Sequence, residues 1–402
     1  MKITHIHIER FRGFQNEDFE VGSLLTAIAG QNGTQKSTLL GIITQTFTLK
    51  TEDSMRVEKP LCGGSYISAF KDKFRLSPTF DKPKGHEWTI SFDAGMDDFT
   101  VESIKRTGDP NVRFWKKGAR QEGDGYISFP TIFLSLKRLV PVAEEAKIIT
   151  DDTLLTQEEL NEFKQLHNKI LIAQTPISSA TTITSKNKQS IGVSTELYDW
   201  NQNSMGQDNL GKIILALFSF KRLHDKYPRQ YKGGILAIDE MDATMYPASQ
   251  VELLKVLRKY ASKLNLQILF TTHSMSLLKA MDDLVQEVTK KEETANQAKI
   301  LYLKKVDDKI AIKQGVNFKG IQLDLNVVAE GNNRKKNRIT AYTEDKENIL
   351  FVKAILKSKA FVLDFVDVTL PCSTLMELVT KRVPAFIYPY SIVILDGDVR
   401  MN

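Results

Sequence analysis

A loop with two glycines, lying between two apolar runs, constrains this chain more than any other feature. Residues 30–38 read Gly-Gln-Asn-Gly-Thr-Gln-Lys-Ser-Thr, with the apolar residues 24–29 before them and 39–43 after them. This order predicts a strand, a tight turn and the start of a helix, where backbone N–H groups can surround a phosphate. We expect Lys36 to reach the outer phosphate oxygens and Ser37 to hold Mg²⁺. The residues expected at the phosphate are Gly30, Asn32, Gly33, Lys36, Ser37 and Thr38.

One residue departs from the P-loop pattern G-x-x-x-x-G-K-[ST]. Gln35 stands where the pattern has its last glycine. Two interpretations stay open. Either the loop tolerates Gln35 and binds ATP with altered turnover, or the residue strains a turn that prefers glycine and nucleotide binding is weak.

The composition of the 402 residues is that of an ordinary globular protein, long enough for two domains. The only two cysteines, Cys62 and Cys372, lie far apart and lack the spacing of a zinc site, which favours a reducing cytoplasm. The N-terminus lacks a signal-peptide core, and no apolar run reaches the roughly 18 residues of a membrane span. The net charge of +6 is compatible with nucleic acid but carries little weight alone. We expect a cytoplasmic protein without a membrane partner.

Acidic residues follow a second apolar run. Residues 235–238 are apolar and lead directly into Asp239 and Glu240. Asp239 at a strand end can join the Mg²⁺ shell, and Glu240 can orient or deprotonate an attacking water. A third apolar run, 267–272, ends at His273. This histidine is either structural or a contact to the γ-phosphate, and its place after the acidic strand favours the second interpretation.

Two further stretches are candidate anion contacts. Residues 203–207 precede a helical run, so that Ser204, Gly206 and Gln207 lie at a helix N-terminus, which favours anions. A plain helix N-cap is the alternative. Near the N-terminus, residues 9–14 form a basic and aromatic turn, which is either a solvated hairpin or a turn that brings Arg12 to a nucleotide.

The remaining pattern predicts an α/β fold. We expect strands at residues 2–8 and 18–29, an antiparallel sheet within 61–128 and a buried strand at 129–136. Residues 142–200 are predicted as a helical insertion, with one helix near 157–173 and a Ser/Thr-rich loop at 178–190.

These motifs, in this order, resemble the ABC-type ATPase heads of the SMC and RecF group. Residues 30–38 resemble Walker A, 203–207 the signature motif, 235–240 Walker B, 241–243 the D-loop, and His273 the switch histidine. The resemblance covers about residues 1–330 and includes the basic turn, so it implies that Arg12 lies near the nucleotide. It also implies ATP and Mg²⁺ as cofactors. Such heads close in pairs, which implies a homodimer or a higher oligomer.

Acidic residues also end two strand-like runs in the last part of the chain. Glu344 follows one run, and Asp396-Gly397-Asp398 follows another. At one edge of a parallel sheet these carboxylates would bind Mg²⁺ or Mn²⁺ and support phosphodiester cleavage. The alternative is an ordinary surface Asp-Gly turn.

Residues 338–402 resemble part of a Toprim domain, and a head followed by Toprim resembles the OLD family of ATPase-nucleases, to which the Gabija nuclease subunit and retron-associated effectors are related. The resemblance implies that Glu344, Asp396 and Asp398 are catalytic metal ligands, with Glu347 as a further ligand. Asp345 stands where many Toprim motifs have glycine, and the stretch is shorter than a complete Toprim domain, so we expect an incomplete unit.

The OLD resemblance implies an ATP-gated DNA endonuclease in anti-phage defence. A reverse transcriptase with its nucleic acid is one implied partner. Two alternatives stay open: a RecF-like DNA clamp and a scaffold ATPase, each without nuclease activity of its own.

Overall fold

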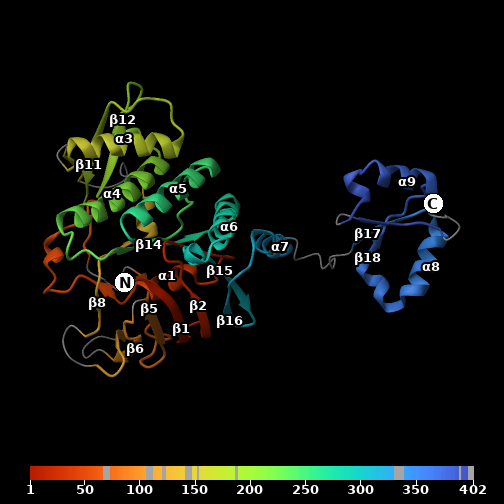
Figure 1. Cartoon of the computed structure of the whole chain (residues 1–402), viewed down its shortest axis with the longest axis horizontal. Coiled ribbons are helices and arrows are strands. Elements are labelled where there is room, and N and C mark those ends of the chain that lie inside the picture. The colour runs from red at the N-terminus through yellow and green to blue at the C-terminus, as the bar shows by residue number, and fades with distance from the viewer. Residues whose placement is uncertain are drawn as a thin grey trace. The chain divides into compact units, whose positions relative to one another are not determined.

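In the computed structural model, a six-stranded sheet lies at the centre of the N-terminal part of the chain (Figure 1). β16 runs antiparallel to β15, and the other neighbours pair in parallel. In order across the sheet, the strands are β16 (Lys309–Lys313), β15 (Ala298–Val306), β3 (Leu25–Gly30), β14 (Leu266–Thr272), β13 (Gly234–Ile238) and β9 (Thr131–Leu134).

The chain folds into two compact units, Met1–Leu325 and Asn326–Asn402. The helix α7 (Phe318–Ala329) runs across the division between them. The structure describes residues 1–66, 73–93, 95–105, 112–119, 124–140, 147–151, 154–185, 189–329, 339–388 and 391–396.

The three middle strands β3, β14 and β13 are buried along their whole length. This explains their continuous apolar sequences, because a strand covered on both faces needs apolar side chains at every position. Alternate residues point to opposite faces. Leu25 and Ala27 therefore belong to one hydrophobic core and Ile28 to the other.

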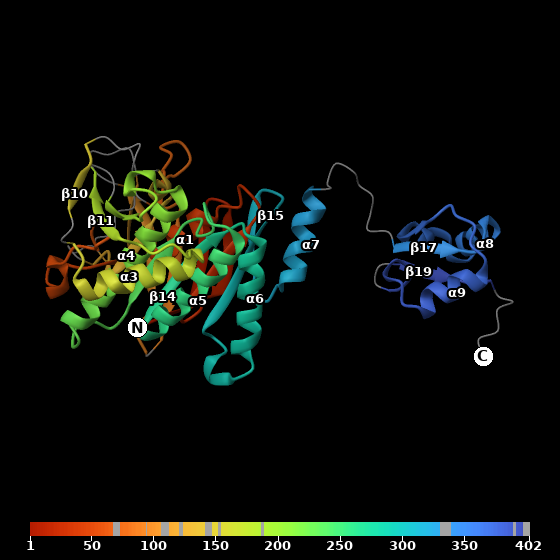
Figure 2. The ribbon, with the colours of Figure 1, turned by 90° about the horizontal axis from the view of Figure 1, so that it is seen from above.

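Helices cover the first face of the sheet. Figure 1 shows α4 and α5 on one side of β14, and α6 packs along β15 (Figure 2). The apolar stripes of these helices fill the first core together with Leu25 and Ala27. The helices are α4 (Met205–Lys226), α5 (Pro247–Lys263) and α6 (Met275–Thr289).

The second core lies under α1 (Lys36–Thr44) and a five-stranded antiparallel sheet. The antiparallel sheet predicted within 61–128 is confirmed by the pairing of β5 with β6 and of β6 with β7. The single strand expected at 18–29 is wrong, because the chain leaves one sheet and enters the other between β2 and β3. In order, the strands are β2 (Phe14–Glu20), β1 (Ile3–Phe11), β5 (Glu87–Phe92), β6 (Phe99–Lys105) and β7 (Val112–Lys116). A short parallel pair joins β4 (Phe47–Thr48) and β8 (Ile127–Ser128).

The insertion contains the expected helix, α3 (Gln157–Leu171), which begins with a capping box between Thr156 and Glu159. The loop expected at 178–190 is instead occupied largely by strands. β10 (Ile149–Asp151), β11 (Ser179–Thr184) and β12 (Gln189–Ser194) form a three-stranded antiparallel sheet. Its Thr and Ile residues are β-branched, and β12 packs against α4, which explains why a polar tract is ordered here.

The C-terminal unit contains a small parallel sheet in the order β18-β17-β19. Its strands are β17 (Ile339–Thr343), β18 (Leu363–Phe365) and β19 (Ser391–Ile394), and its helices are α8 (Lys346–Leu356) and α9 (Cys372–Thr380). The predicted α/β fold with mixed and antiparallel sheets is confirmed. In the described part of the chain, no helix combines the length and apolarity needed to cross a bilayer.

Candidate nucleotide site

The predicted site residues of the N-terminal unit leave the sheet at one edge. β3, β14 and β13 are parallel, with Ala29 beside Thr272 and Ile238 beside Phe270. Loops that follow neighbouring parallel strands emerge at the same edge. Three groups therefore lie next to each other. They are the loop 30–38, here called the phosphate loop, the acidic pair Asp239 and Glu240 after β13, and His273 after β14.

The loop between β3 and α1 has the backbone of a tight turn. Gly30 has φ 150°, and a Cβ on it would lie 2.4 Å from the Leu303 carbonyl oxygen, so only glycine fits there. Lys36 is buried and its Nζ donates hydrogen bonds to the carbonyl oxygens of Gly30 (3.0 Å) and Gln31 (2.8 Å). A phosphate has stronger acceptors than these two carbonyls, so Lys36 is held where it can exchange partners.

Four other residues of the loop lie around Lys36. Asn32 and Ser37 are exposed, Gly33 has φ 79°, and Thr38 is partly buried. The backbone and the hydroxyls therefore remain accessible to a ligand at the start of α1.

Gln35 takes the left-handed conformation that the missing glycine would take, with φ 61° and ψ 32°. A side chain in this region costs roughly 1–2 kcal/mol. The side chain lies against the turn between β1 and β2, because a Cβ on Gly13 would lie 2.8 Å from Gln35 Nε2. Gln35 Oε1 is buried without a hydrogen-bond partner among the described residues. The turn therefore forms with Gln35 in place, and the strain is local to this residue.

The hydroxyl of Ser37 and the carboxylate of Asp239 meet directly. Ser37 Oγ donates to Asp239 Oδ1 at 2.8 Å, and Thr271 Oγ1 donates to the same oxygen at 2.7 Å. Asp239 is 5% exposed. A buried carboxylate with one hydroxyl on each side has the oxygen donors that Mg²⁺ prefers, and its remaining charge calls for a cation. These residues fit a Mg²⁺ site.

Glu240 follows in an unusual backbone conformation, with φ 48°. Its N–H donates to Thr271 Oγ1 at 2.6 Å, and its carbonyl accepts from Arg138 Nη2 at 2.7 Å. Non-glycine residues with positive φ often mark functional sites whose surroundings hold the strain. Both sides of the Glu240 residue are thus fixed, which sets the direction of its side chain.

Arg138 is a site residue that the sequence alone did not indicate. It lies on the short helical turn η2 (Leu136–Leu139) after β9 and is 2% exposed. Its Nε donates to Asn209 Oδ1 at 2.7 Å, and Asn209 Nδ2 donates to the Ala243 carbonyl at 2.9 Å. The sequence held one indication of this role. Arg138 follows the buried strand β9, and the strand that pairs with β9, β13, leads into Asp239 and Glu240.

The pKa values follow from this crowding of charge. Burial lowers the pKa of Lys36 to about 8, against the attraction of Glu240 and Asp239. Burial likewise lowers the pKa of Arg138 to about 10, against the same carboxylates. Partial burial and the charge of Lys36 lower the pKa of His273, which keeps its imidazole neutral at pH 7. His273 is exposed, and its backbone N–H donates to Asp242 Oδ1 at 3.3 Å.

The predicted signature segment forms the N-terminus of α4. Ser204 and Gln207 make a reciprocal capping box, with Ser204 N donating to Gln207 Oε1 at 2.8 Å. The plain N-cap is therefore present. Gly206 packs against the backbone of Thr244, since a Cβ there would lie 2.6 Å from the Thr244 carbonyl oxygen. Ser204 is exposed, so an anion contact from another molecule is compatible with the cap.

Arg12 is engaged away from the phosphate loop. Its guanidinium bonds to both carboxylate oxygens of Asp81, at 3.1 and 2.9 Å, and to the Arg75 carbonyl at 2.8 Å. The neighbouring Gly13, rather than Arg12 itself, meets the loop at Gln35. A role for Arg12 at the nucleotide stays a prediction.

Glu344 and Asp396 lie at one edge of the sheet of the C-terminal unit. Thr343 of β17 pairs with Ile394 of β19, so Glu344 and Asp396 follow adjacent strand ends. Asp345 caps α8, with its Oδ1 accepting from Asn348 N at 2.9 Å. Glu347 and Asp396 are exposed. Among the described residues, no three His, Cys, Asp or Glu side chains form a group able to hold a metal, and Asp398 lies outside those residues.

Comparison with known proteins gives one family match. The family model AAA_15, described as an AAA ATPase domain, matches residues 141–278, which include Asp239, Glu240 and His273. No curated protein matches the chain.

Among solved structures, the chain is similar to three SMC head domains. The SMC head from Thermotoga maritima is 14% identical with a TM-score of 0.43, over 79% of this chain and 100% of that one. An Smc head bound to the C-winged helix domain of ScpA is 14% identical with a TM-score of 0.46, over 80% and 100%. An Smc head from Pyrococcus furiosus, with an extended coiled coil and bound to the C-terminal domain of ScpA, is 13% identical with a TM-score of 0.44, over 83% and 100%.

The family match lies on the part of the chain that supplies the acidic pair and the histidine of the site. The phosphate loop that precedes the matched residues supplies Lys36 and Ser37 to the same edge of the sheet. The chain therefore carries an ATPase domain.

Proposed function

We propose that this chain binds ATP with Mg²⁺ and hydrolyses it at the edge formed by β3, β13 and β14. The observation that carries the proposal is the hydrogen bond from Ser37 Oγ to Asp239 Oδ1, which joins the phosphate loop to the acidic strand end. Ser37 and Asp239 would hold Mg²⁺, which supplies charge neutralisation at the phosphates when bound. Lys36 binds the outer phosphate, and Glu240 orients water as general base.

Binding and hydrolysis are separable in the test. Titration of the protein with ATP and Mg²⁺ in a calorimeter measures binding, and Asp239→Asn is expected to remove its Mg²⁺ dependence. Asp282→Asn, which changes a half-buried acidic residue on α6, is the matched control. ATP affinity that is equal in all three proteins, with and without Mg²⁺, contradicts the assignment of Ser37 and Asp239.

The ABC-type arrangement further suggests that two heads close on nucleotide. Ser204 is exposed at the N-terminus of α4, where free N–H groups and the helix dipole favour an anion. We propose that this end completes the nucleotide site of a second copy. Light scattering of Glu240→Gln with ATP is expected to show a dimer that Ser204→Arg abolishes.

We also propose, from the resemblance to the OLD family, that the C-terminal unit cleaves DNA with Mg²⁺ or Mn²⁺ through Glu344, Asp396 and Asp398, in anti-phage defence. The adjacent ends of β17 and β19 support this proposal. Nucleotide state would gate cutting rather than power it. In this setting a reverse transcriptase with its nucleic acid is the proposed partner.

Cleavage of supercoiled and linear DNA in either metal, with and without ATP, tests this activity. Asp396→Ala is expected to abolish it, while Asp367→Ala, an exposed residue of the same unit, leaves it intact. Equal cutting by wild type and Lys36→Ala, with or without ATP, contradicts gating.

A DNA clamp or scaffold ATPase without nuclease activity is the second candidate. The observation that favours it is the engagement of Asp345 as a helix cap. Metal-dependent thermal stabilisation that is lost in Asp396→Ala counts against it.

A further inference from the structure

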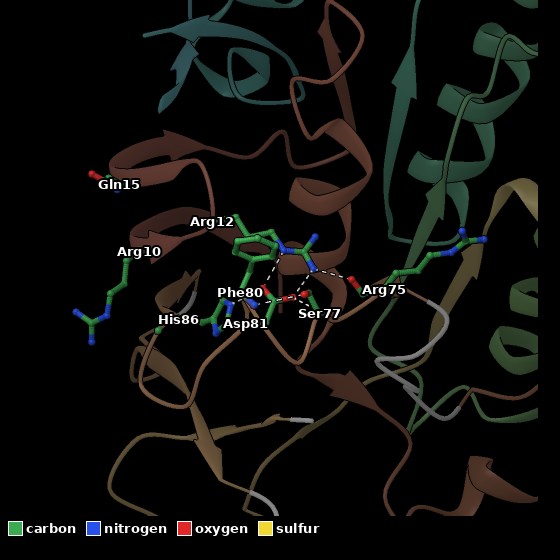
Figure 3. A pocket seen from close by; sticks show the side chains of 9 residues that line it. Arg10, Arg12, Gln15, Arg75, Ser77, Phe80, Asp81 and His86 are labelled. Atoms are coloured by element: carbon green, nitrogen blue, oxygen red, sulfur yellow. Dashed lines mark hydrogen bonds and ion pairs between the residues drawn. The ribbon is translucent and has the colours of Figure 1, made fainter. Parts of the chain in front are cut away.

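A hollow of about 570 Å³ opens in the N-terminal unit between the turn after β1 and the segment 75–86 (Figure 3). This volume is large enough for a nucleotide-sized group. Its lining is basic and contains an aromatic ring. The lining residues used below are Arg10, Arg12, Arg75, Phe80, Asp81 and His86.

The acidic residue of the hollow is fully engaged. Asp81 accepts hydrogen bonds from Arg12 Nε and Nη2, at 3.1 and 2.9 Å, and from Ser77 N at 2.7 Å. His86 Nε2 lies 3.0 Å from Asp81 Oδ1. Asp81 is 4% exposed, so its negative charge is neutralised inside the protein and does not repel an anion at the mouth of the hollow.

Positive charge remains at the mouth. Arg10 is half-exposed and pairs with Glu9 and with Glu87, and Lys117 pairs with Glu87 as well. Among the described residues, the Arg75 guanidinium does not lie within ion-pair distance of a carboxylate, and this lining residue is exposed. Figure 3 shows the side chains of Arg10 and Arg75 running in different directions from Arg12, so the cations are spread out rather than gathered at one point. This suits several phosphates in a row better than one.

Phe80 is presented to solvent by an ordered turn. It is 86% exposed, yet its N–H donates to Ser77 Oγ at 3.3 Å and Asp81 N donates to the Ser77 carbonyl at 2.8 Å. Arg12, directly after β1, donates to Asp81 and so anchors this turn to the end of β1. A fixed, exposed aromatic ring beside Arg75, which has no carboxylate partner among the described residues, is a combination that suits single strands, because bases stack on rings and phosphates meet cations.

We infer that this hollow binds single-stranded nucleic acid, with a base stacked on Phe80 and neighbouring phosphates at Arg75 and Arg10. The inference rests on the proposed role of this chain with nucleic acid, and its test requires neither ATP hydrolysis nor DNA cleavage. A duplex does not satisfy the site, because its bases are already stacked on each other and offer no free face to Phe80.

Fluorescence anisotropy with a labelled oligo-dT strand, an oligo-U strand and a duplex of equal length tests the inference without ATP. Phe80→Ala is expected to weaken single-strand binding by about 5- to 100-fold, and Phe80→Trp to restore it. Arg75→Gln is expected to reduce the slope of log affinity against log salt by about 0.7, the value for one phosphate on a single strand.

Matched controls come from the same unit. Leu197→Ala removes a side chain that is 81% exposed, and Arg258→Gln removes a surface arginine on α5. Both are expected to bind single strands as the wild type does. Because Phe80 is exposed, its replacement leaves the fold intact, which circular dichroism checks.

Three results overturn the inference. The first is absence of single-strand binding by the wild type, whether or not it hydrolyses ATP. The second is equal binding by wild type and Phe80→Ala. The third is an equal loss of ATP affinity and strand affinity in Phe80→Ala, which assigns the hollow to the base of ATP. Failure of ATP hydrolysis with strand binding intact overturns only the proposed ATPase function.

Discussion

Arg138 Nε donates a 2.7 Å hydrogen bond to Asn209 Oδ1, and this contact joins the end of β9 to the first turns of α4. The other guanidinium nitrogens of Arg138 hold the Glu240, Leu134 and Ser135 carbonyls. The side-chain amide of Asn209 in turn donates a hydrogen bond to the Ala243 carbonyl. One buried cation thus connects the catalytic candidate Glu240, the D-loop and the predicted signature helix.

We predict that Arg138→Lys lowers ATP turnover by about 10- to 100-fold while ATP affinity changes little, because misplacement of a catalytic group costs rate rather than binding. A lysine keeps the charge but cannot reach all four acceptors. Separate measurement of kcat and KM checks this prediction. Equal losses of affinity and turnover would mean that Arg138 only supports folding.

Asn209→Asp distinguishes the contact of Asn209 with Arg138 from its contact with the Ala243 carbonyl. An aspartate still accepts from Arg138 but presents an oxygen to the Ala243 carbonyl in place of the N–H donor. We expect a lower kcat with the Arg138 contact retained, and non-additive effects when it is combined with Arg138→Lys. Additive effects in this double-mutant cycle would show that the residues act independently.

Gln35→Gly tests the effect of the strained loop. The left-handed backbone at Gln35 costs roughly 1–2 kcal/mol, so relief of that strain corresponds to at most about a 30-fold gain in ATP affinity. Gln35→Val is expected to bind ATP more weakly, because a β-branched residue tolerates positive φ poorly. Calorimetric titration of the wild type, Gln35→Gly and Gln35→Val with ATP measures these differences in affinity. A gain far above 30-fold would mean that Gln35 distorts the site beyond its own backbone.

The pH dependence of ATP binding follows from Lys36. Its pKa is lowered to about 8 in the free protein, so the side chain is charged below that pH and neutral above it. ATP favours the charged form, and we therefore expect affinity to be constant near pH 7 and to fall as the pH rises through 8 toward 9.5. In Lys36→Arg the guanidinium does not titrate in this range, and the decline should disappear. A decline of the same size in both proteins would place the titrating group elsewhere.

The sequence predicted what lies close together along the chain. The loop residues 30–38 and the pair Asp239 and Glu240 each follow an apolar run, and the parallel sheet then brings them to one edge. Arg138 and Asn209 are 71 positions apart, and neither belongs to a local pattern, so their contact emerges only from the fold. The tract 178–190 was mistaken for a loop because its polar composition outweighed the β-branched residues that pair in β11 and β12.

The central claim is that Lys36, Ser37, Asp239 and Glu240 form one ATP-hydrolysing site. The most direct measurement is phosphate release from ATP by the purified protein with and without Mg²⁺, beside Lys36→Ala, Glu240→Gln and the control Asp282→Asn. We predict Mg²⁺-dependent phosphate release by the wild type and the control, and loss of release in both site variants. Of these two variants, only Glu240→Gln is expected to retain ATP binding. Equal release by all four proteins, or none from a wild type that does not bind ATP, would contradict the central claim.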